Sequence, residues 1–524
     1  MRKDTTKYNQ ELLETSASKE NLILLIFIVI SLLISLFPVH YGYFRDELYY
    51  IALSKNLAWG YVDVPPLMPI CIAAMRWLFG SSLTAIHLLP AAFGVIVLIL
   101  TRSIVKKFDG GLFAQTLALT SVTFALFYDV VNSWVTYDSF NRLFWSLGIY
   151  SIVCLLKTEK KKYWIYAGIF AGLGLMCKFD MFWLGGGILI ALLFTRQRKY
   201  YLCRQFWIGG LIAFIILLPY LIWIIDTNFL TLEYFRNYSH ETAHINFLMF
   251  FVAQIFVMNY LALPVWFCGL YYFIFNKTGK KYRLLGIAYF AIAVLCVAMQ
   301  TKFYVIMPFY FVLFAGGAVL IESLIGKSRM LWLKIVYCSL IIIVGLIYLP
   351  LMRPVLPVQA AAEYANFLMP SSKRIATENF KPTILPQILA DRFGWKEMTA
   401  KVAKIYYSLP EEQRKNTYIF TSNYGEASAI YFYRKEYRLP IPISEHLQYY
   451  VWGYRGANQK STFIRVGKSK ESMEHYRTFF DSVKKVGQID SEYGMSSENK
   501  PIYLCTGLKI PIEKLWLAGK SMNM

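Results

Sequence analysis

The stretch YFRDELYY (residues 43–50) places three charged side chains together, directly after an apolar run long enough to cross most of a membrane. Charge beside a bilayer is costly unless it faces water or takes part in chemistry. An ionised carboxylate such as Asp46 can accept the proton of a hydroxyl group and act as a general base. A plainer alternative is that Asp46 caps the amphipathic, interfacial helix that we predict from Asp46 to Trp59. Its charged neighbours are Arg45 and Glu47.

A second acid and two lysines stand in similar places. Asp138 in VTYDSFNRLFW, Lys178 in CKFD and Lys302 in QTKFY each lie at an end of an apolar run. Two carboxylates from separate elements can serve as base and orienting group, or as ligands of a divalent metal. Lysines near such acids suit an anionic phosphate and a hydroxyl nucleophile. Taken singly, Asp138 could cap a helix and each lysine could snorkel to water, which is the commoner case.

The segment HETAH, from His240 to His244, matches the H-E-x-x-H pattern in which two histidines hold zinc and the glutamate activates water. It lies in a connection rich in Tyr and Asn, without an apolar helix around it. No third ligand follows at the metzincin spacing, although Glu233 or another acid could supply one. We therefore favour substrate contact, or a divalent metal beside the site, over a zinc protease.

The elements that hold these residues belong to a membrane protein. The chain has 524 residues, of which 57% are hydrophobic and 16% charged. We expect a polytopic α-helical protein with about eleven spans, the first of them a signal anchor rather than a cleaved signal peptide. The expected spans are residues 22–37, 83–105, 112–127, 140–156, 163–176, 181–194, 206–225, 247–275, 284–299, 303–325 and 335–351.

The charge pattern predicts which side of the membrane each connection faces. Five basic clusters, TRSIVKK, KTEKKK, TRQRKYYLCR, NKTGKKYR and GKSRMLWLK, occupy every second connection and hold 18 Lys and Arg. Cytoplasmic loops carry such an excess, so the N-terminus is expected inside and everything after residue 351 outside. The net charge of +22 could suggest a nucleic-acid partner, but the location of the basic clusters between apolar runs argues against one. The candidate site residues all fall in the remaining, outer connections.

Composition divides the chain into residues 1–351, a transmembrane domain with a first external loop at 40–82, and residues 352–524, a small external α/β domain. In the second part GWKEMTAKVAKIYYSL predicts a helix, and TYIFTSN, TFIRVG and PIYLCTG predict strands. SNYGEASAIYFY runs from a strand through Gly425 into a helix. The start of that helix could hold an anion, but a turn that only serves the fold is favoured. Eight scattered cysteines indicate neither a disulfide framework nor a metal–cysteine site.

Several blocks resemble bacterial family-39-type glycosyltransferases, which are similar to the dolichyl-phosphate-mannose–protein mannosyltransferases and to the aminoarabinose transferases of lipid A. The most specific block is YFRDELYYIALSKNLAWGYVDVPPLMPI. Later blocks resemble the family in the same order, and the resemblance covers most of the chain. They are TYDSFNRLFW, GLGLMCKFDMFW, YSHETAHINF, QTKFYVIMPFYFVLFAGGA, LPQILADRFGWKEM and TSNYGEASAIYFY.

The resemblance implies a C-type glycosyltransferase fold with an outward-facing site and a polyprenyl-phosphate sugar as donor. It implies Asp46 as the base that acts on the acceptor hydroxyl and Asp138 as a supporting acid. Arg45, Glu47, Lys178, Lys302, His240 and His244 are then expected to bind substrate. Glu47 is expected mainly to support the site. Some relatives bind a divalent metal near these residues and others do not, so the cofactor stays open.

The sequence therefore predicts a glycosyltransferase of the bacterial inner membrane. It moves a sugar from a polyprenyl-monophosphate donor to a hydroxyl of an envelope acceptor, which could be a protein, lipid A or a cell-wall polymer. The alternative is a transporter or flippase for a polar lipid, because buried charges also mark transport paths. Against it, the charges gather at outer span ends, and we expect no discontinuous helices of the kind that transporters use.

Overall fold

The computed structural model describes residues 2–37, 41–241, 247–325, 331–369, 383–467, 473–494 and 499–523, without the side chains of residues 2–16 and 239–241. The chain forms two compact units, and each is assembled from segments that are far apart in the sequence. The helical unit contains Met1–Pro38, Thr84–Leu218 and His244–Leu349. The sheet unit contains Val39–Leu83, Pro219–Ala243 and Pro350–Met524. The domain boundary at residues 351 and 352 stays a prediction.

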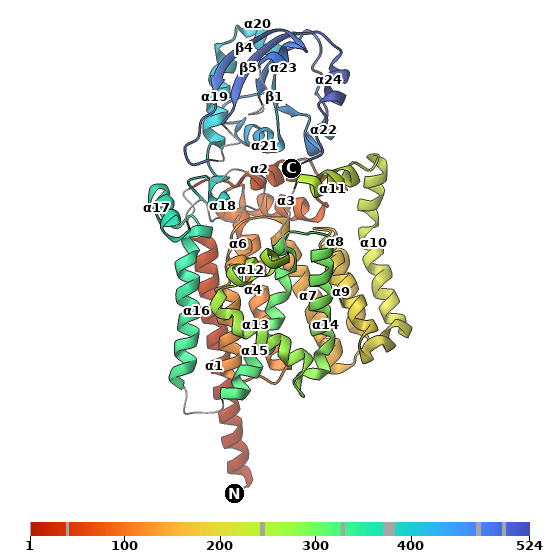
Figure 1. Ribbon diagram of the computed structural model, residues 1–524, viewed down its shortest axis with the longest axis vertical. Helices are drawn as coiled ribbons and strands as arrows, with labels where there is room; N and C mark the ends of the chain where they lie inside the picture. The colour runs from red at the N-terminus through yellow and green to blue at the C-terminus, as the bar shows by residue number, and fades with distance from the viewer. Residues whose placement is uncertain are drawn as a thin grey trace. The chain divides into compact units, whose positions relative to one another are not determined.

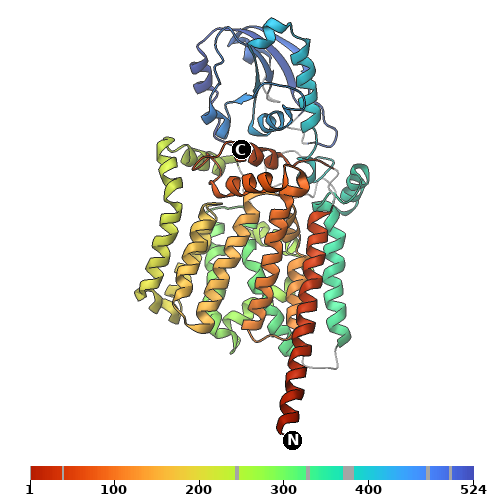
Figure 2. The same ribbon diagram turned by 180° about the vertical axis from the view of Figure 1, so that it is seen from behind.

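A helical segment occupies each of the predicted spans (Figure 1). In the described part of the chain, seven helices are long and apolar enough to cross a membrane, or up to nine if two bent pairs each count as one span. Within the helical unit α7 packs on α8, α9 on α14 and α13 on α15, as Figures 1 and 2 show from opposite sides. The helices are α1 (Arg2–Leu36), α4 (Leu83–Lys107), α5 (Leu112–Thr123), α6 (Leu126–Ser133), α7 (Tyr137–Thr158), α8 (Lys162–Leu175), α9 (Met181–Leu193), α10 (Arg204–Asp226), α12 (Phe247–Val257), α13 (Leu263–Ile274), α14 (Arg283–Ala298), α15 (Tyr310–Ile325) and α16 (Leu331–Met352), with the 3-10 turns η1 (Arg196–Leu202), η2 (Tyr260–Ala262), η3 (Gly279–Tyr282) and η4 (Phe303–Phe309).

Two predicted spans are broken helices. Helices α5 and α6 meet at a bend of 64°, and α12 meets the segment Tyr260–Ile274 at a bend of 97°. Asn259, at the second break, donates from Nδ2 to the carbonyl of Phe124 at the first break, at 3.1 Å, and to that of Ile341 in α16, at 2.9 Å. Its Oδ1 accepts the N–H of Leu261 at the second break, at 3.2 Å. Backbone groups freed inside a membrane protein must find partners in the protein. The expectation of no discontinuous helices was therefore wrong, and Asn259 supplies partners for freed backbone groups at both breaks.

The sheet unit contains a five-stranded sheet in the order β2-β1-β3-β5-β4. β1 pairs in parallel with β2 and β3, whereas β5 pairs antiparallel with β3 and β4. The three predicted strands and the predicted helix α19 are confirmed. The strands are β1 (Thr417–Thr421), β2 (Ile443–Ser444), β3 (Thr462–Val466), β4 (Phe480–Gln488) and β5 (Pro501–Leu508). The helices of the unit are α2 (Arg45–Ser54), α3 (Leu67–Phe79), α11 (Leu230–Glu241), α17 (Val358–Leu368), α18 (Gln387–Ala390), α19 (Trp395–Ser408), α20 (Glu411–Lys415), α21 (Tyr424–Tyr433), α22 (Leu447–Trp452), α23 (Met473–Arg477) and α24 (Ile512–Ala518).

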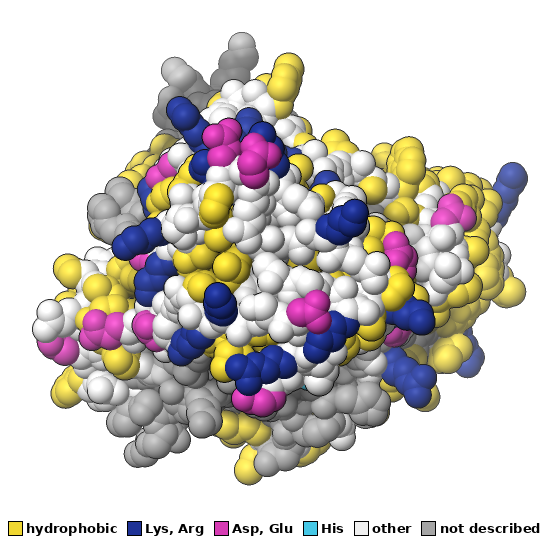
Figure 3. Space-filling model, turned by 90° about the horizontal axis from the view of Figure 1, so that it is seen from above, with side chains coloured by type: hydrophobic (Ala, Val, Ile, Leu, Met, Phe, Trp, Pro, Cys, Tyr) yellow, Lys and Arg dark blue, Asp and Glu magenta, His cyan; other side chains and the backbone are white. Residues whose placement is uncertain are grey.

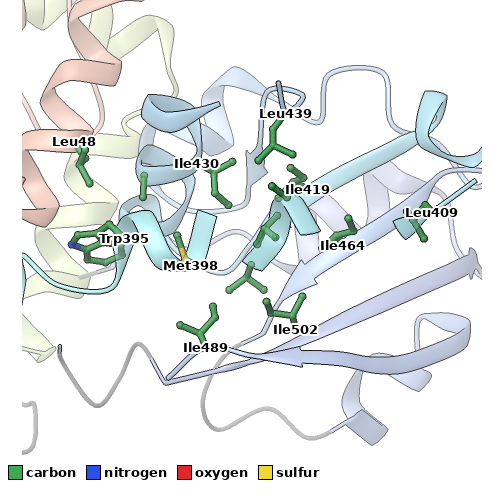
Figure 4. Packing of buried hydrophobic residues seen from close by; sticks show 14 residues of the cluster. Leu48, Trp395, Met398, Leu409, Ile419, Ile430, Leu439, Ile464, Ile489 and Ile502 are labelled. Carbon is green, nitrogen blue, oxygen red and sulfur yellow. The ribbon is translucent and has the colours of Figure 1, made fainter. Parts of the chain in front are cut away.

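Helix α2 of the first loop belongs to the core of the sheet unit. Leu48 is fully buried in one hydrophobic cluster with Trp395 and Met398 of α19, Ile419 of β1 and Ile430 of α21 (Figure 4). Burial of apolar surface is the main favourable term in folding. This cluster therefore joins a helix near the N-terminus to strands and helices that lie more than 300 residues later in the chain.

The observed α2 differs from the predicted interfacial helix. It ends at Ser54 instead of continuing to Trp59, and of its ten residues all but Asp46 are buried. The alternation of apolar and polar residues predicted an interfacial helix. In the structure, however, protein rather than lipid or water covers the faces of α2. Asp46 is thus the one residue of α2 that reaches the surface.

Truncation of Leu48 should destabilise the sheet unit. We expect Leu48→Ala to lower the free energy of unfolding by about 2–5 kcal/mol, because a buried leucine is replaced by a cavity. Leu57→Ala is the matched control, since Leu57 is 56% exposed, and it should cost much less. Thermal unfolding of the purified protein in detergent measures both. Equal unfolding midpoints for the two variants would contradict the placement of α2 in this core.

Candidate active site

The carboxylate of Asp46 is held by a tyrosine of the C-terminal part of the chain. The Tyr424 hydroxyl donates to Asp46 Oδ1 at 2.7 Å, and Arg45 Nε lies 3.4 Å from the same oxygen. One quarter of the Asp46 side chain is exposed, at 25%. The second oxygen, Oδ2, has no hydrogen-bond partner within the described residues. Asp46 is thus an oriented carboxylate with one oxygen open to an incoming hydroxyl.

The ring of Tyr424 is itself fixed by its neighbours. It stacks on the His446 ring, with 5.4 Å between centroids, and lies 4.9 Å from the ring of Tyr49. The guanidinium of Arg45 lies over its face at 5.5 Å. The Tyr424 N–H donates to His446 Nδ1 at 3.2 Å. The hydroxyl therefore reaches Asp46 from a ring that is packed on several sides, which limits its rotation.

The start of α21 is built so that α2 can approach it. A Cβ atom on Gly425 would stand 2.8 Å from Arg45 Cγ and 3.0 Å from Arg45 Cδ, so a side chain there would collide with Arg45. The side chain of Asn423 accepts the Glu426 N–H, and Glu426 accepts the N–H groups of Ser422 and Asn423. Glu426 also pairs with the buried ammonium of Lys500. Because the helix start is closed by its own side chains, these observations favour the turn over the anion site for this segment.

The two charged neighbours of Asp46 support α2. Glu47 is fully buried, and its Oε2 accepts the Phe44 N–H at 3.0 Å, so Glu47 rather than Asp46 caps the helix start. Arg392 Nη1 lies 3.9 Å from the same oxygen. Arg45 is 3.9 Å from the carboxylate of Asp391, and its backbone N–H donates to the Asp391 carbonyl. Substrate binding by Arg45 and Glu47 stays a prediction, and the positions of both side chains fit a supporting role.

Asp63 is a site acid that sequence reasoning gave no role. The Tyr49 hydroxyl donates to Asp63 Oδ1 at 2.7 Å, and Tyr49 also packs against Tyr424. Burial, with a smaller contribution from the charge of Asp46, raises the pKa of Asp63 to about 7, although the bond from Tyr49 opposes this. A carboxyl group with such a pKa can carry or release a proton near neutral pH. The only sequence signal was its place in VDVPP, where one valine separates it from two prolines.

A second cluster of charges lies in the helical unit. Asp138 begins α7, where Thr136 Oγ1 accepts its N–H, and Lys178 stands in the turn between α8 and α9. Lys178 Nζ is 2.6 Å from Asp138 Oδ1 and 2.7 Å from Asp180 Oδ2. These side chains are mostly buried, with 16–18% of each exposed. An ammonium group shared between two carboxylates holds both acids in place.

Aromatic rings and a second lysine complete this cluster. Lys178 Nζ lies 4.5 Å from the centre of the Tyr137 ring and 5.2 Å from that of Tyr304. Lys302 Nζ lies 6.0 Å from the centre of the Tyr304 ring. Burial raises the pKa of Asp180, and the charges of Lys178 and Lys302 oppose this rise. The predicted residues Asp138, Lys178 and Lys302 thus lie in one neighbourhood of the helical unit. Asp180, the last residue of the CKFD segment, is a further partner to which the sequence pattern gave no role.

The histidines of HETAH cannot be placed in either cluster. His244 lies outside the described residues, and of His240 only the backbone, in the last turn of α11, is described. In the described part of the chain, no group of three or more His, Cys, Asp or Glu could hold a metal ion. The sequence left open whether the protein binds a divalent metal. The described side chains provide no candidate set of ligands for one.

Comparisons with known proteins agree with the resemblance found in the sequence. Residues 63–223, which include Asp138 and Lys178, match the family described as dolichyl-phosphate-mannose-protein mannosyltransferase. The crystal structure of apo ArnT from Cupriavidus metallidurans superposes with a TM-score of 0.58 at 12% identity, over 92% of this chain and 97% of that chain. The structure of ArnT from the same organism bound to undecaprenyl phosphate gives 0.54 at the same identity and coverage. No curated protein matches the chain significantly in sequence.

The structural likeness establishes the fold, and the family match adds a sequence similarity over residues 63–223. The predicted C-type glycosyltransferase fold is confirmed by the superposition over nearly the whole length of both chains. The predicted family resemblance is confirmed by the match over residues 63–223. Asp46 and Lys302 lie outside that matched segment, so their roles depend on the geometry described above.

The raised pKa of Asp63 predicts how stability depends on pH. An unfolded Asp has a pKa of about 3.9. The folded chain therefore retains a proton that the unfolded chain releases between about pH 4 and 7. The stability that this proton provides is complete below about pH 4 and is lost as pH rises to about 7. Relative to Asp63→Asn, the wild type should lose at most about 1.4 kcal/mol per pH unit in this window and level off above about pH 8. Unfolding midpoints from pH 5 to 8.5 test this, and parallel curves for the two proteins would contradict it.

Proposed function

We infer that this chain, a membrane glycosyltransferase of the protein-mannosyltransferase type, moves a sugar from a polyprenyl-monophosphate donor to a hydroxyl group of an envelope acceptor. The observation that carries the proposal is the partly exposed carboxylate of Asp46, oriented by the Tyr424 hydroxyl on a helix that is otherwise buried. The acceptor class stays open between a protein, lipid A and a cell-wall polymer. The bound undecaprenyl phosphate of ArnT supports a lipid-phosphate donor.

In this proposal Asp46 is the general base. A hydroxyl group is a poor nucleophile until a carboxylate accepts its proton in the transition state. The acceptor oxygen forms a bond to the anomeric carbon of the sugar, and the bond from that carbon to the phosphate oxygen breaks. The proton passes to Asp46 Oδ2, and the polyprenyl phosphate leaves with the electron pair of the broken bond.

The cluster of the helical unit suits the other half of the reaction. Negative charge develops on the lipid phosphate as it leaves, and fixed cations stabilise such charge. Lys178 and Lys302 are the proposed donors to the phosphate, and Asp138 and Asp180 hold Lys178 until the substrate arrives. Asp138 is thus assigned as a supporting acid, and His240 and His244 stay candidates for substrate contact.

The proposal places the reaction on the outer side of the bacterial inner membrane, with residues 352–524 outside as well. The support is the excess of Lys and Arg in every second connection, which is typical of cytoplasmic loops. The candidate acids and lysines fall in the other connections.

The broken spans are the feature that favours the alternative of a polar-lipid transporter or flippase. Transporters use unwound helices to present backbone groups to substrates and ions. Here, however, the carbonyl of Phe124 at one break is bound by Asn259 at the other. A carbonyl that is already bonded inside the protein is less available to a transported ion, so the breaks alone do not outweigh the oriented carboxylate.

Replacement of the proposed base should abolish transfer without unfolding the chain. We expect Asp46→Asn to reduce the transfer rate by about 10²–10⁴-fold, because the amide cannot accept the proton. Mass spectrometry of envelope glycoconjugates from a deletion strain, restored with wild type or variant, measures this. A sugar-sized mass should return with wild type and not with Asp46→Asn. Asp481→Asn, which changes an exposed acid of the sheet unit, is the control and should restore it. Full restoration by Asp46→Asn would contradict the assignment.

Removal of the Tyr424 hydroxyl should weaken the base but keep it in place. Bonds to charged groups contribute about 1.5–3 kcal/mol, so Tyr424→Phe should slow transfer by roughly tenfold or more. Tyr454→Phe is the matched control, since Tyr454 donates to Glu513 at 3.0 Å on an exposed part of the same unit. A transfer rate like that of wild type in Tyr424→Phe would contradict the role of this hydroxyl.

A further inference from the structure

Four cations of the sheet unit lie together beside α2. Lys55 follows the end of α2, Arg76 is in the last turn of α3, and Arg434 and Lys435 follow α21. Lys55 Nζ is 5.3 Å from the centre of the Tyr431 ring, and the Arg434 guanidinium is 5.1 Å from the same ring. Three separate parts of the chain therefore bring positive charge to one place.

The Lys55 ammonium lies close enough to the other three cations for their charges to act on it. Desolvation of the Lys55 ammonium comes first, and the charges of Arg76, Arg434 and Lys435 add to it, so that the pKa of Lys55 falls to about 8. Burial is the larger cause, and the three neighbouring cations add an electrostatic cost to the charged form of Lys55. An anion bound among them would remove that cost.

No carboxylate balances this group within the described residues. Arg76 donates to two serine hydroxyls, of Ser54 at 3.0 Å and Ser81 at 2.9 Å. Glu436, the acid next in sequence, lies 2.8 Å from Lys396 of α19. On the face that Figure 3 shows, by contrast, Lys and Arg side chains are interspersed with Asp and Glu. The four side chains thus form a local excess of positive charge.

Exposed apolar side chains adjoin the cations in the chain. Trp77, Leu78 and Phe79 directly follow Arg76, and Trp77 is 84% exposed. Leu57 and Trp59, which follow Lys55, are also exposed. Large apolar residues with tryptophan among them are typical of segments that lie at the membrane–water interface. Water alone would not favour this many exposed apolar groups in two short stretches.

We propose that Lys55, Arg76, Arg434 and Lys435 form a binding site for the phosphate head group of an anionic membrane lipid. The apolar side chains that follow Arg76 and Lys55 contact the acyl region next to that head group. The adjacent apolar groups favour a lipid over free phosphate as the source of the anion. The site uses neither Asp46 nor the Asp138 cluster, so it goes beyond the proposed transfer reaction.

The test measures lipid binding by the full-length protein in a neutral detergent, by native mass spectrometry. Phosphatidylglycerol is the probe, with phosphatidylcholine and inorganic phosphate at the same phosphate concentration as the other arms. The variant is Lys55→Gln/Arg434→Gln/Lys435→Gln. We expect wild type to bind phosphatidylglycerol in preference to phosphatidylcholine. The variant should lose at least about tenfold of the phosphatidylglycerol affinity, since each cation near an anionic lipid surface contributes measurably.

A matched control removes three exposed lysines from elsewhere in the sheet unit, as Lys484→Gln/Lys485→Gln/Lys514→Gln. It should bind phosphatidylglycerol like wild type. Equal losses in the two triple variants would overturn the site in favour of a general charge effect. Equal binding of phosphatidylcholine, or displacement of the lipid by inorganic phosphate, would overturn the assignment to an anionic lipid head group.

A single surface change keeps the test decisive if the triple variant fails to fold. Lys435→Glu alters one exposed side chain and should weaken phosphatidylglycerol binding by severalfold, with an unchanged unfolding midpoint. Unaltered binding by this folded variant would overturn the proposal. Glycoconjugate profiles are read in parallel with wild type, so that loss of the transfer activity and loss of the lipid site can be told apart.

Discussion

The docking of helix α2 on the sheet unit is the constraint on which the proposed chemistry depends. A general base must be held close to its working geometry by groups that are themselves fixed. Leu48 anchors α2 in the core of the sheet unit, and Gly425 leaves room for the Arg45 side chain. Tyr424 then reaches Asp46 with its hydroxyl. Residues in the C-terminal part of the chain thereby help to orient the candidate base.

The same docking explains why the charged residues around Asp46 differ in their burial. Glu47 and Arg392 are buried and close the start of the helix, whereas Asp46 reaches the surface. Burial of unpaired charge would be costly, so the inner members have partners within the unit. Asp63, bonded to Tyr49, adds a partly buried acid whose pKa is near neutrality. The supporting residues are thus the buried ones, and Asp46 stays accessible to substrate.

Local sequence pattern predicted much of this arrangement. The acidic motif after the first span, the helix α19 and the strands β1, β3 and β5 carry clear signals of charge or periodicity. Strand β4 was missed because FDSVKKVGQ is polar and exposed along most of its length, as suits an edge strand. The bond from Tyr424 to Asp46 joins residues 378 positions apart, and no local pattern encodes such a contact. The break at Asn259 was not predicted, for the same reason. The carbonyl groups that accept hydrogen bonds from Asn259 are far from it in the sequence.

The most direct test of the central claim, that α2 is an integral part of the sheet unit, is amide hydrogen exchange of the wild-type protein. Stable cores open only through large, cooperative unfolding, whereas loosely attached segments exchange through local opening. If α2 shares the core, the amides of residues 49–53 should exchange as slowly as those of residues 428–432 in α21. Rapid exchange across α2, with α21 still protected, would contradict the account and leave Asp46 without its fixed support.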